Sequence, residues 1–339
     1  MAITIQQALA KILDHEDLQS QQMEEVMNQI MQGEATSAQI AGFVIALRMK
    51  GESINELAAA AKVMRNLSSK VEVGLEDLVD TCGTGGDGSK TFNVSTASAI
   101  VAASAGVNIA KHGNRSVSSK SGSADVLEAL GVRLDLEPEQ VAKCVQDIGI
   151  GFMFAPMHHS SMKHAAVPRK ELAVRTLFNL LGPLTNPAGA KRQVMGVFDN
   201  AWLEPIAQVL KSLGAQKALV VHADDGLDEL SISAASQVCE LNNGSVKTYQ
   251  ITPEDMGLAR STLDEIQVQD VIQSASMIKE VLAGKPGAAA DIVALNAGAA
   301  IYVADKADSL ELGVALAQDR IISGAAKEKL DQLIMFTNQ

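Results

Sequence analysis

Aromatic side chains are scarce, because Phe, Trp and Tyr together make up 3% of the 339 residues. A core with few large rings is filled instead by Ala, Gly and Met, which favours closely packed helices. Cysteine is scarce too: Cys82, Cys144 and Cys239 are odd in number and lie far apart. Their spacing excludes a disulfide framework and fits no metal motif, so we expect a reducing, cytoplasmic environment.

Positive charge is in deficit as well. The net charge is −12 and the pI is about 5. A protein that binds nucleic acid generally presents a basic face, so we expect no nucleic-acid partner. No apolar run reaches the length of a membrane span, and the first residues lack the layout of a signal peptide. We therefore expect no membrane association.

Hydrophobic periodicity divides the chain into a helical and an α/β part. Helical patterns fill residues 4–69, with stops at Gly33 and Gly51. Short apolar strands then alternate with helices, and Asn243-Gly244 marks a hairpin. This order predicts an α/β fold with a mostly parallel central sheet flanked by helices. We expect strands near 79 and at 107–111, 150–154, 193–198, 218–221, 237–241 and 246–251, and helices at 95–105, 124–130, 138–147, 202–213, 270–283, 288–303 and 308–335, the last interrupted at Gly324.

The densest cluster of chemically useful residues lies at 80–123. It begins with a glycine-rich loop at 83–88, in which four glycines within six residues let backbone N–H groups approach a ligand closely. Asn93, Ser95 and Thr96 follow where a helix begins, and helix N-termini favour anions. After the next strand, the segment 111–119 adds two cations and three hydroxyl groups. Together these groups suit a ligand that carries several phosphates.

Two common nucleotide-binding motifs do not fit this cluster. A dinucleotide-binding unit needs an acid at the end of the next strand, whereas that strand ends in Lys111-His112. A Walker loop needs Gly-Lys-Ser/Thr, which is absent.

Two further polar segments follow. The run 224–229 places four acids within six residues after an apolar strand, which is typical of an Mg²⁺ site, although a solvated acidic loop is the alternative. The segment 157–170 holds three of the six histidines without zinc-like spacing, so we expect solvated or capping histidines there. We assign no catalytic nucleophile or base. The composition favours a reaction driven by positioning and charge neutralisation, such as transfer of a phosphorylated group or sugar.

The segments 80–88, 93–96, 111–119 and 169–187, with Asp228-Glu229, resemble the signature of the anthranilate phosphoribosyltransferase family of tryptophan biosynthesis, and the resemblance spans most of the chain. It implies a nucleoside phosphorylase-like fold. A small discontinuous helical domain would comprise 1–70 with 165–187 returning to it, and a large α/β domain would comprise 71–164 and 188–339. It also implies a homodimer formed through the helical domain.

The resemblance further implies the activity: transfer of the phosphoribosyl group of 5-phosphoribosyl 1-diphosphate to the amine of anthranilate, with Mg²⁺ as cofactor. Anthranilate would be held by Gly83, Asn114 and Arg169, and Mg²⁺ by Ser95, Asp228 and Glu229. Phosphoribosyl diphosphate would be held by Gly83, Gly86, Asp87, Thr91, Asn93, Val94, Ser95, Thr96, Lys111, His112, Gly113, Asn114, Arg115, Ser116, Val117, Ser118, Ser119 and Ser123.

One departure from the family pattern concerns the anthranilate site. Ala166-Val167-Pro168-Arg169 stands where the family more often has Pro-Val-Arg, which makes Arg175 the reserve candidate for Arg169. Two alternatives remain open: a pyrimidine nucleoside phosphorylase, which resembles this family in domain layout, and a non-enzymatic nucleic-acid-binding relative of the same fold.

Overall fold

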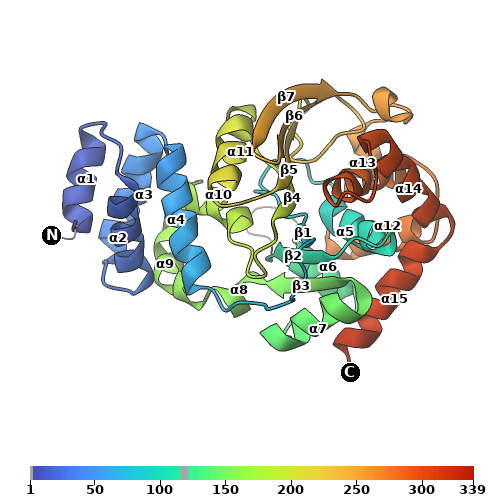
Figure 1. Ribbon diagram of the computed structural model, residues 1–339, viewed down its shortest axis with the longest axis horizontal. Helices are drawn as coiled ribbons and strands as arrows, with labels where there is room; N and C mark the ends of the chain where they lie inside the picture. Colours follow the sequence, from blue (N-terminus) through green and yellow to red (C-terminus); the bar gives the residue numbers. More distant parts are fainter. Residues whose placement is uncertain (1–2, 116–120) are drawn as a thin grey trace.

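The structure, a computed structural model, describes residues 3–115 and 121–339, and it has a small helical lobe beside a larger α/β lobe (Figure 1). Capping side chains explain where three of the first helices begin, because Thr4, Thr36 and Ser53 each accept a hydrogen bond from the first turn. The small lobe starts with α1 (Ile5–Leu13), α2 (Ser20–Met31), α3 (Ser37–Lys50) and α4 (Ile54–Leu67). Their apolar faces, Met23 and Met27 included, are fully buried against one another.

A later part of the chain returns to this lobe. The helix α9 (Lys163–Leu172) packs on α2 and α3, and the short helix α10 (Leu177–Leu181) packs on α3 and α4 (Figure 1). Leu177 and Phe178 are buried in the same core as the first four helices. Periodicity does not predict α9, because Pro168 lies inside it and its sequence is largely polar.

The large lobe is built on a seven-stranded sheet in the order β3-β2-β1-β4-β5-β6-β7. The strands β3, β2, β1, β4 and β5 run parallel to one another, while β6 and β7 form an antiparallel hairpin at one edge. The mostly parallel sheet predicted from the sequence is therefore confirmed, as is the hairpin turn at Asn243-Gly244. The strands are β1 (Val79–Asp80), β2 (Ile109–Gly113), β3 (Ile150–Phe154), β4 (Arg192–Gly196), β5 (Lys217–Ala223), β6 (Ser236–Asn242) and β7 (Ser245–Ile251).

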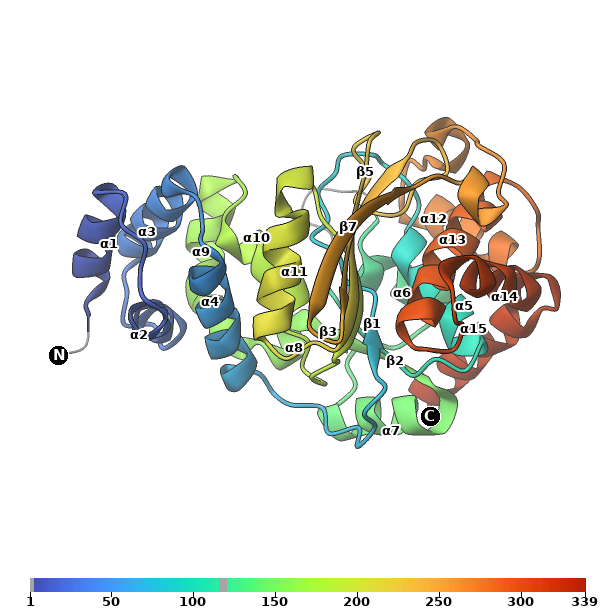
Figure 2. The ribbon, with the colours of Figure 1, turned by 45° about the horizontal axis from the view of Figure 1, so that its top comes forward.

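Helices cover both faces of the sheet (Figure 2). Successive residues of β5 illustrate this, because Leu219 and Val221 join the core on one face whereas Ala218 and Val220 join the core on the other. The first face is covered by α5 (Val94–Ser104), α6 (Ser123–Leu130), α12 (Val271–Leu282), α13 (Ala288–Val303), α14 (Leu310–Ile322) and α15 (Ala325–Thr337). The second is covered by α11 (Leu203–Ser212), and β3 is flanked by α7 (Pro138–Ile148).

Small residues allow these helices to pack closely, as the composition predicts. A Cβ added at Gly298 of α13 would lie 2.6 Å from the backbone nitrogen of Val314 on α14, so this crossing requires glycine. The three cysteines are free, and among the described residues no helix is both long and apolar enough to cross a membrane.

Candidate active site

The predicted phosphate-binding segments meet at the edge of the sheet where the parallel strands end. The glycine-rich loop follows β1, the cationic segment begins with Lys111 inside β2, and the acidic run follows β5. In open α/β sheets this edge is where ligands bind. Because β1, β2, β4 and β5 run parallel, segments separated by more than a hundred residues arrive side by side.

The glycine-rich loop leads directly into the N-terminus of α5. Asn93 caps this helix by accepting a hydrogen bond from the Thr96 N–H at 3.0 Å, and its side-chain amide donates to the Ser121 carbonyl at 2.9 Å. The cap therefore ties the helix start to the segment before α6. Val94 and Thr96 are buried, so at Val94 only the backbone is free to serve a ligand. The hydroxyl of Thr96 has no hydrogen-bond partner among the described residues.

Backbone approaches backbone closely where this loop passes β4. A Cβ at Gly83 would lie 3.0 Å from the carbonyl oxygen of Gly196, the last residue of β4. A Cβ at Gly196 would in turn overlap the backbone carbonyl of Asp228. Gly196 is thus the spacer that lets two segments lie together: the glycine-rich loop at 83–88, called the phosphate loop from here on, and the acidic loop at 224–229. The sequence analysis missed it, although a glycine ending an apolar strand is a signal for close backbone approach.

Lys111 and Asp80 are buried at the ends of β2 and β1. The Lys111 ammonium donates to the Thr81 carbonyl at 2.8 Å and to the Thr81 hydroxyl at 3.1 Å. The Asp80 carboxylate accepts from the His112 backbone at 3.1 Å and from the Asn186 side chain at 2.7 Å. Burial raises the pKa of Asp80 to about 6, against the opposing effect of Lys111. Lys111 thus brings positive charge to the base of the glycine-rich loop.

The segment after β2 divides into an inner and an outer part. His112 and Gly113 are buried within β2, while Asn114 is exposed and its carbonyl accepts a hydrogen bond from the Ser123 hydroxyl at 3.3 Å. Arg115 points away from the loop, because its guanidinium pairs with Asp125 and Glu128 on α6. Its predicted role in phosphate binding remains a prediction. The predicted residues Ser116, Val117, Ser118 and Ser119 lie outside the described residues.

The acidic run separates into two pairs. Asp224 accepts hydrogen bonds from Gln237 and Gln250, and Asp225 accepts from the hydroxyls of Ser231 and Ser233. These two acids serve the local loop. Asp228 and Glu229 turn instead toward the phosphate loop and the start of α5. Burial raises the pKa of both, and backbone hydrogen bonds from Gly85 to Asp228 and from Ser95 to Glu229 offset part of that rise.

The surroundings of Asp228 and Glu229 fit a divalent cation. Burial raises the pKa of both, and the negative charge of Asp87 raises each further. Lys111 offsets only part of the negative charge at Glu229, and Mg²⁺ would offset more of it. Among the described residues, no three Asp, Glu, His or Cys side chains group into a metal cage. That agrees with Mg²⁺, which is usually held by one or two carboxylates together with substrate phosphates.

The two candidate anthranilate arginines lie on the returning helical segment. Arg169 on α9 is half-buried, with its guanidinium 5.4 Å from the ring centre of Phe178, and burial lowers its pKa. Arg175, between α9 and α10, donates a hydrogen bond to the Gly86 carbonyl and stacks 4.1 Å from the ring centre of Phe198. Both arginines project from the small lobe, and Arg175 contacts the phosphate loop itself.

The prediction of solvated or capping histidines is wrong for two of the three in this region. His158 and His159 are buried, and the His159 ring lies 5.1 Å from that of His112. Burial lowers the pKa of His112 to about 3 and that of His159 to about 4, so both are neutral at pH 7. The tertiary contact between β3 and β2, which the sequence pattern does not reveal, encloses them.

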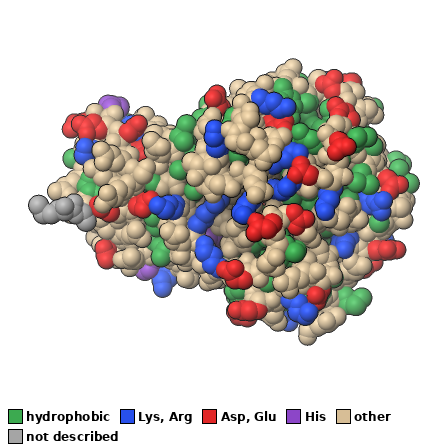
Figure 3. All heavy atoms as spheres, in the orientation of Figure 1, with side chains coloured by type: hydrophobic (Ala, Val, Ile, Leu, Met, Phe, Trp, Pro, Cys, Tyr) green, Lys and Arg blue, Asp and Glu red, His purple; other side chains and the backbone are tan. Residues whose placement is uncertain are grey.

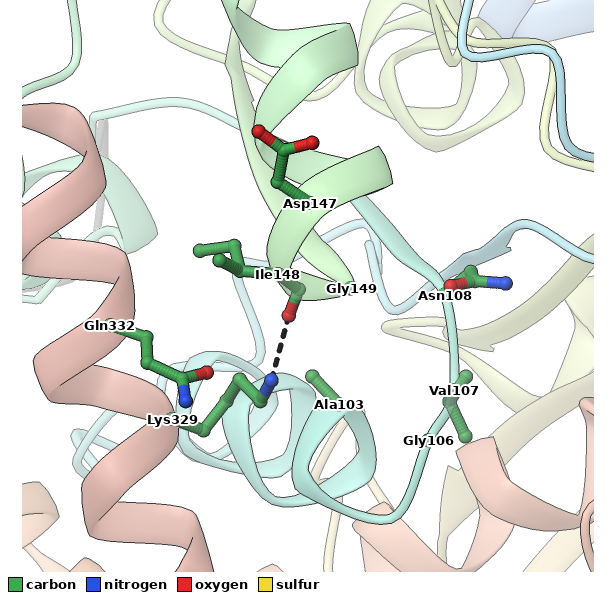
Figure 4. A pocket seen from close by; sticks show the side chains of 9 residues that line it. All are labelled: Ala103, Gly106, Val107, Asn108, Asp147, Ile148, Gly149, Lys329 and Gln332. Carbon is green, nitrogen blue, oxygen red and sulfur yellow. Dashed lines mark hydrogen bonds between the residues drawn. The ribbon is translucent and has the colours of Figure 1, made fainter.

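A separate hollow of about 470 Å³ lies at the opposite edge of the sheet, before β2 and β3, and contains none of the predicted site residues (Figure 4). Lys329 reaches across it to the Ile148 carbonyl at 2.7 Å. On the face seen in Figure 3, acidic and basic side chains are interspersed over both lobes.

Two family models match this architecture. The glycosyl transferase family, helical bundle domain, matches residues 6–68, and the glycosyl transferase family, a/b domain, matches residues 75–327. The class is thus a glycosyl transferase built from a helical bundle and an α/β domain.

Individual relatives narrow this class. The chain is 60% identical over 333 residues to anthranilate phosphoribosyltransferase of Thioalkalivibrio sulfidiphilus, covering 98% of each chain. The structure of that enzyme from Thermus thermophilus is 44% identical, with a TM-score of 0.93 over 98% of this chain and 99% of that one. The Saccharomyces cerevisiae enzyme in complex with phosphoribosyl diphosphate and Mg has a TM-score of 0.90 at 28% identity, over 98% of each chain. The chain belongs to the anthranilate phosphoribosyltransferase family.

Proposed function

We propose that this protein transfers the phosphoribosyl group of 5-phosphoribosyl 1-diphosphate to the amine of anthranilate, releasing pyrophosphate, with Mg²⁺ as cofactor. The observation that carries the proposal is that the glycine-rich loop, Lys111 of β2 and the acidic loop meet beside the N-terminus of α5. A helix N-terminus and free backbone N–H groups favour phosphates, and the acidic pair favours the cation that accompanies them.

The proposed roles of the residues are those that the family resemblance implies. Gly83, Gly86 and Asp87 would present the loop to the diphosphate, and Asn93 and Ser95 would do the same from the helix start. Lys111 would hold positive charge near the leaving group. The set assigned to phosphoribosyl diphosphate also includes Thr91, Val94, Thr96, His112, Gly113, Asn114, Arg115, 116–119 and Ser123.

The acidic pair and the returning helical segment would serve the cation and the acceptor. Asp228, Glu229 and Ser95 would hold Mg²⁺, which supplies positive charge to the departing pyrophosphate. Arg169 would face the carboxylate of anthranilate, and Gly83 and Asn114 would contact the same substrate. Positioning lets the amine attack C1 as the bond to pyrophosphate breaks. The bonding electrons leave with pyrophosphate, and the amine gives up its proton to water or to the departing pyrophosphate.

The test is loss of anthranilate fluorescence with and without phosphoribosyl diphosphate, repeated after Mg²⁺ is removed with a chelator. We expect the fluorescence to fall only when phosphoribosyl diphosphate and Mg²⁺ are both present. Consumption of a pyrimidine nucleoside with orthophosphate would favour the phosphorylase alternative. A gel shift with nucleic acid, without any anthranilate loss, would favour the binding-protein alternative.

We also propose the domain division and the assembly. Burial of Leu177 and Phe178 among the first helices supports a helical domain of 1–70 with 165–187, beside an α/β domain of 71–164 and 188–339.

Leu13 on α1 and Met49 on α3 are 65% and 80% exposed, which supports a homodimer formed through the helical domain. Sedimentation of Met49→Lys beside the unaltered protein tests this, since a monomeric variant is expected. A cytoplasmic location is supported by the free cysteines and is tested by cell fractionation.

A further inference from the structure

Arg175 joins three parts of the structure that are distant in sequence. Its guanidinium donates to the Gly86 carbonyl in the glycine-rich loop and stacks on Phe198, which follows β4. Its own carbonyl accepts a hydrogen bond from Arg48 on α3 at 2.6 Å. The side chain therefore connects the small helical lobe to the turn of the phosphate loop.

The loop is held at its two ends by backbone hydrogen bonds, and between them Gly85 contacts Asp228. At the start, the Thr84 N–H donates to the Gly196 carbonyl at 2.9 Å, and at the end the Lys90 carbonyl accepts from the Val268 N–H at 2.9 Å. Gly85, Gly86 and Gly88 between these anchors all have φ between 65° and 82°, a region that glycine enters freely. Peptide units in such a stretch have little intrinsic preference for one orientation.

The hydrogen bond from Arg175 selects one orientation. Because a trans peptide unit is planar, its C=O and N–H point in opposite directions. When the Gly86 carbonyl points to Arg175, the N–H of Asp87 points away from that side chain. A carbonyl turned the other way would present negative charge to a phosphate, whereas an N–H presents a donor.

We propose that Arg175 is a positioning residue that orders the phosphate loop by holding the Gly86–Asp87 peptide in its anion-binding orientation. Arg48 anchors Arg175 to α3, so the placement of the helical lobe sets the order of the loop. The identity of the ligand, the diphosphate of phosphoribosyl diphosphate, rests on the proposed function, whereas the ordering of the loop does not.

The experiment compares Arg175→Met and Arg175→Lys with Lys170→Met, which removes an exposed side chain of α9. Amide hydrogen exchange of residues 83–92, without substrates, is measured beside the kinetics. For Arg175→Met we expect about tenfold faster exchange in the loop and a ~10- to 100-fold higher KM for phosphoribosyl diphosphate, the range for losing one charged hydrogen bond. The KM for anthranilate should change less than about threefold, because the proposal gives Arg175 no hydrogen bond to anthranilate that the variant would lose.

The other variants sharpen the result. Arg175→Lys keeps the charge without the planar fork, so it should recover only part of the loop protection. Arg48→Met should loosen the loop to a smaller degree, and Lys170→Met should match the unaltered protein. Unchanged exchange of β5 would show that the fold is intact.

The proposal would be overturned if Arg175→Met kept both the exchange of the loop and the KM for phosphoribosyl diphosphate near the wild-type values. It would also be overturned if the KM for anthranilate rose more than the KM for phosphoribosyl diphosphate. If the unaltered protein failed to consume anthranilate, the proposed function would fail, and the exchange measurement would still decide the role of Arg175.

Discussion

Replacing the acidic pair, Asp228→Asn with Glu229→Gln, should raise stability and nearly abolish turnover. Both carboxylates are half-buried beside Asp87, and burial together with mutual repulsion raises their pKa values. A raised pKa means that the folded protein binds the proton more tightly than the unfolded chain does. The ionised pair therefore destabilises the native state at high pH, and the penalty fades as pH falls toward the ordinary carboxyl value near 4.

The amides remain neutral at every pH. We expect the unfolding free energy of the double variant, at pH 8 with a chelator present, to exceed that of the unaltered protein by about 1–3 kcal/mol, the usual cost of a buried group without a partner. For a protein of this size, that corresponds to a Tm about 1–4 °C higher. At pH 5 the difference should be much smaller.

Activity should move in the opposite direction. Each lost carboxylate removes about 1.5–3 kcal/mol of charged interaction with the cation, so Mg²⁺ should bind at least about a hundredfold more weakly. High Mg²⁺ or Mn²⁺ should restore part of the rate. Thermal melts from pH 5 to 8, circular dichroism and a Mg²⁺ titration of activity are the measurements. Asp224→Asn, in the same run but bonded to Gln237 and Gln250, is the matched control and should stay active.

A folded double variant that works normally at low Mg²⁺ would remove the metal role from this pair. A double variant that melts lower than the unaltered protein at pH 8 in chelator would refute the electrostatic reasoning.

Three other perturbations probe the site. Arg169→Ala should raise the KM for anthranilate roughly ten- to hundredfold through the loss of ~1.5–3 kcal/mol, and initial-rate kinetics showing equal damage to both substrates would contradict its assignment. Phosphoribosyl diphosphate with Mg²⁺, at about a hundred times its Kd, should stabilise the protein by about 2.7 kcal/mol in a thermal scan, and anthranilate alone much less. Gly196→Ala should cost about 1–3 kcal/mol and most activity, because the added methyl overlaps the Asp228 backbone, whereas Gly182→Ala has open space and should melt normally.

The sequence predicts the elements better than their contacts. Most strands and helices lie within a few residues of the expected ranges, because their apolar patterns face a core. Strand β2 runs to Gly113, two residues beyond the expected end at 111, because His112 and Gly113 look like the start of a loop although they are buried. The helix α9 escapes prediction because its partner surface, α2 and α3, compensates for Pro168.

The site is predicted in the same partial way. The resemblance names the segments that meet at the sheet edge, but tertiary contacts decide where each side chain points. Asp225 accepts hydrogen bonds from serines in its own loop, and Arg115 pairs with acids on α6. From residue type alone, Asp225 is as good a metal ligand as Asp228, and Arg115 is as good a phosphate ligand as Lys111. The local pattern offers only a hint of Gly196, a glycine that ends an apolar strand, and it does not show that Asp228 lies against it or that Arg175 contacts Gly86.

The return of α9 and α10 to the first four helices has a consequence for how the chain folds. The helices α1 to α4 emerge first during synthesis, but the surface that Leu177 and Phe178 cover stays bare until more than a hundred further residues have been made. Long-range closure of this kind slows folding, and exposed apolar surface in the interval invites aggregation. We expect a truncated chain that ends before α9 to be poorly soluble.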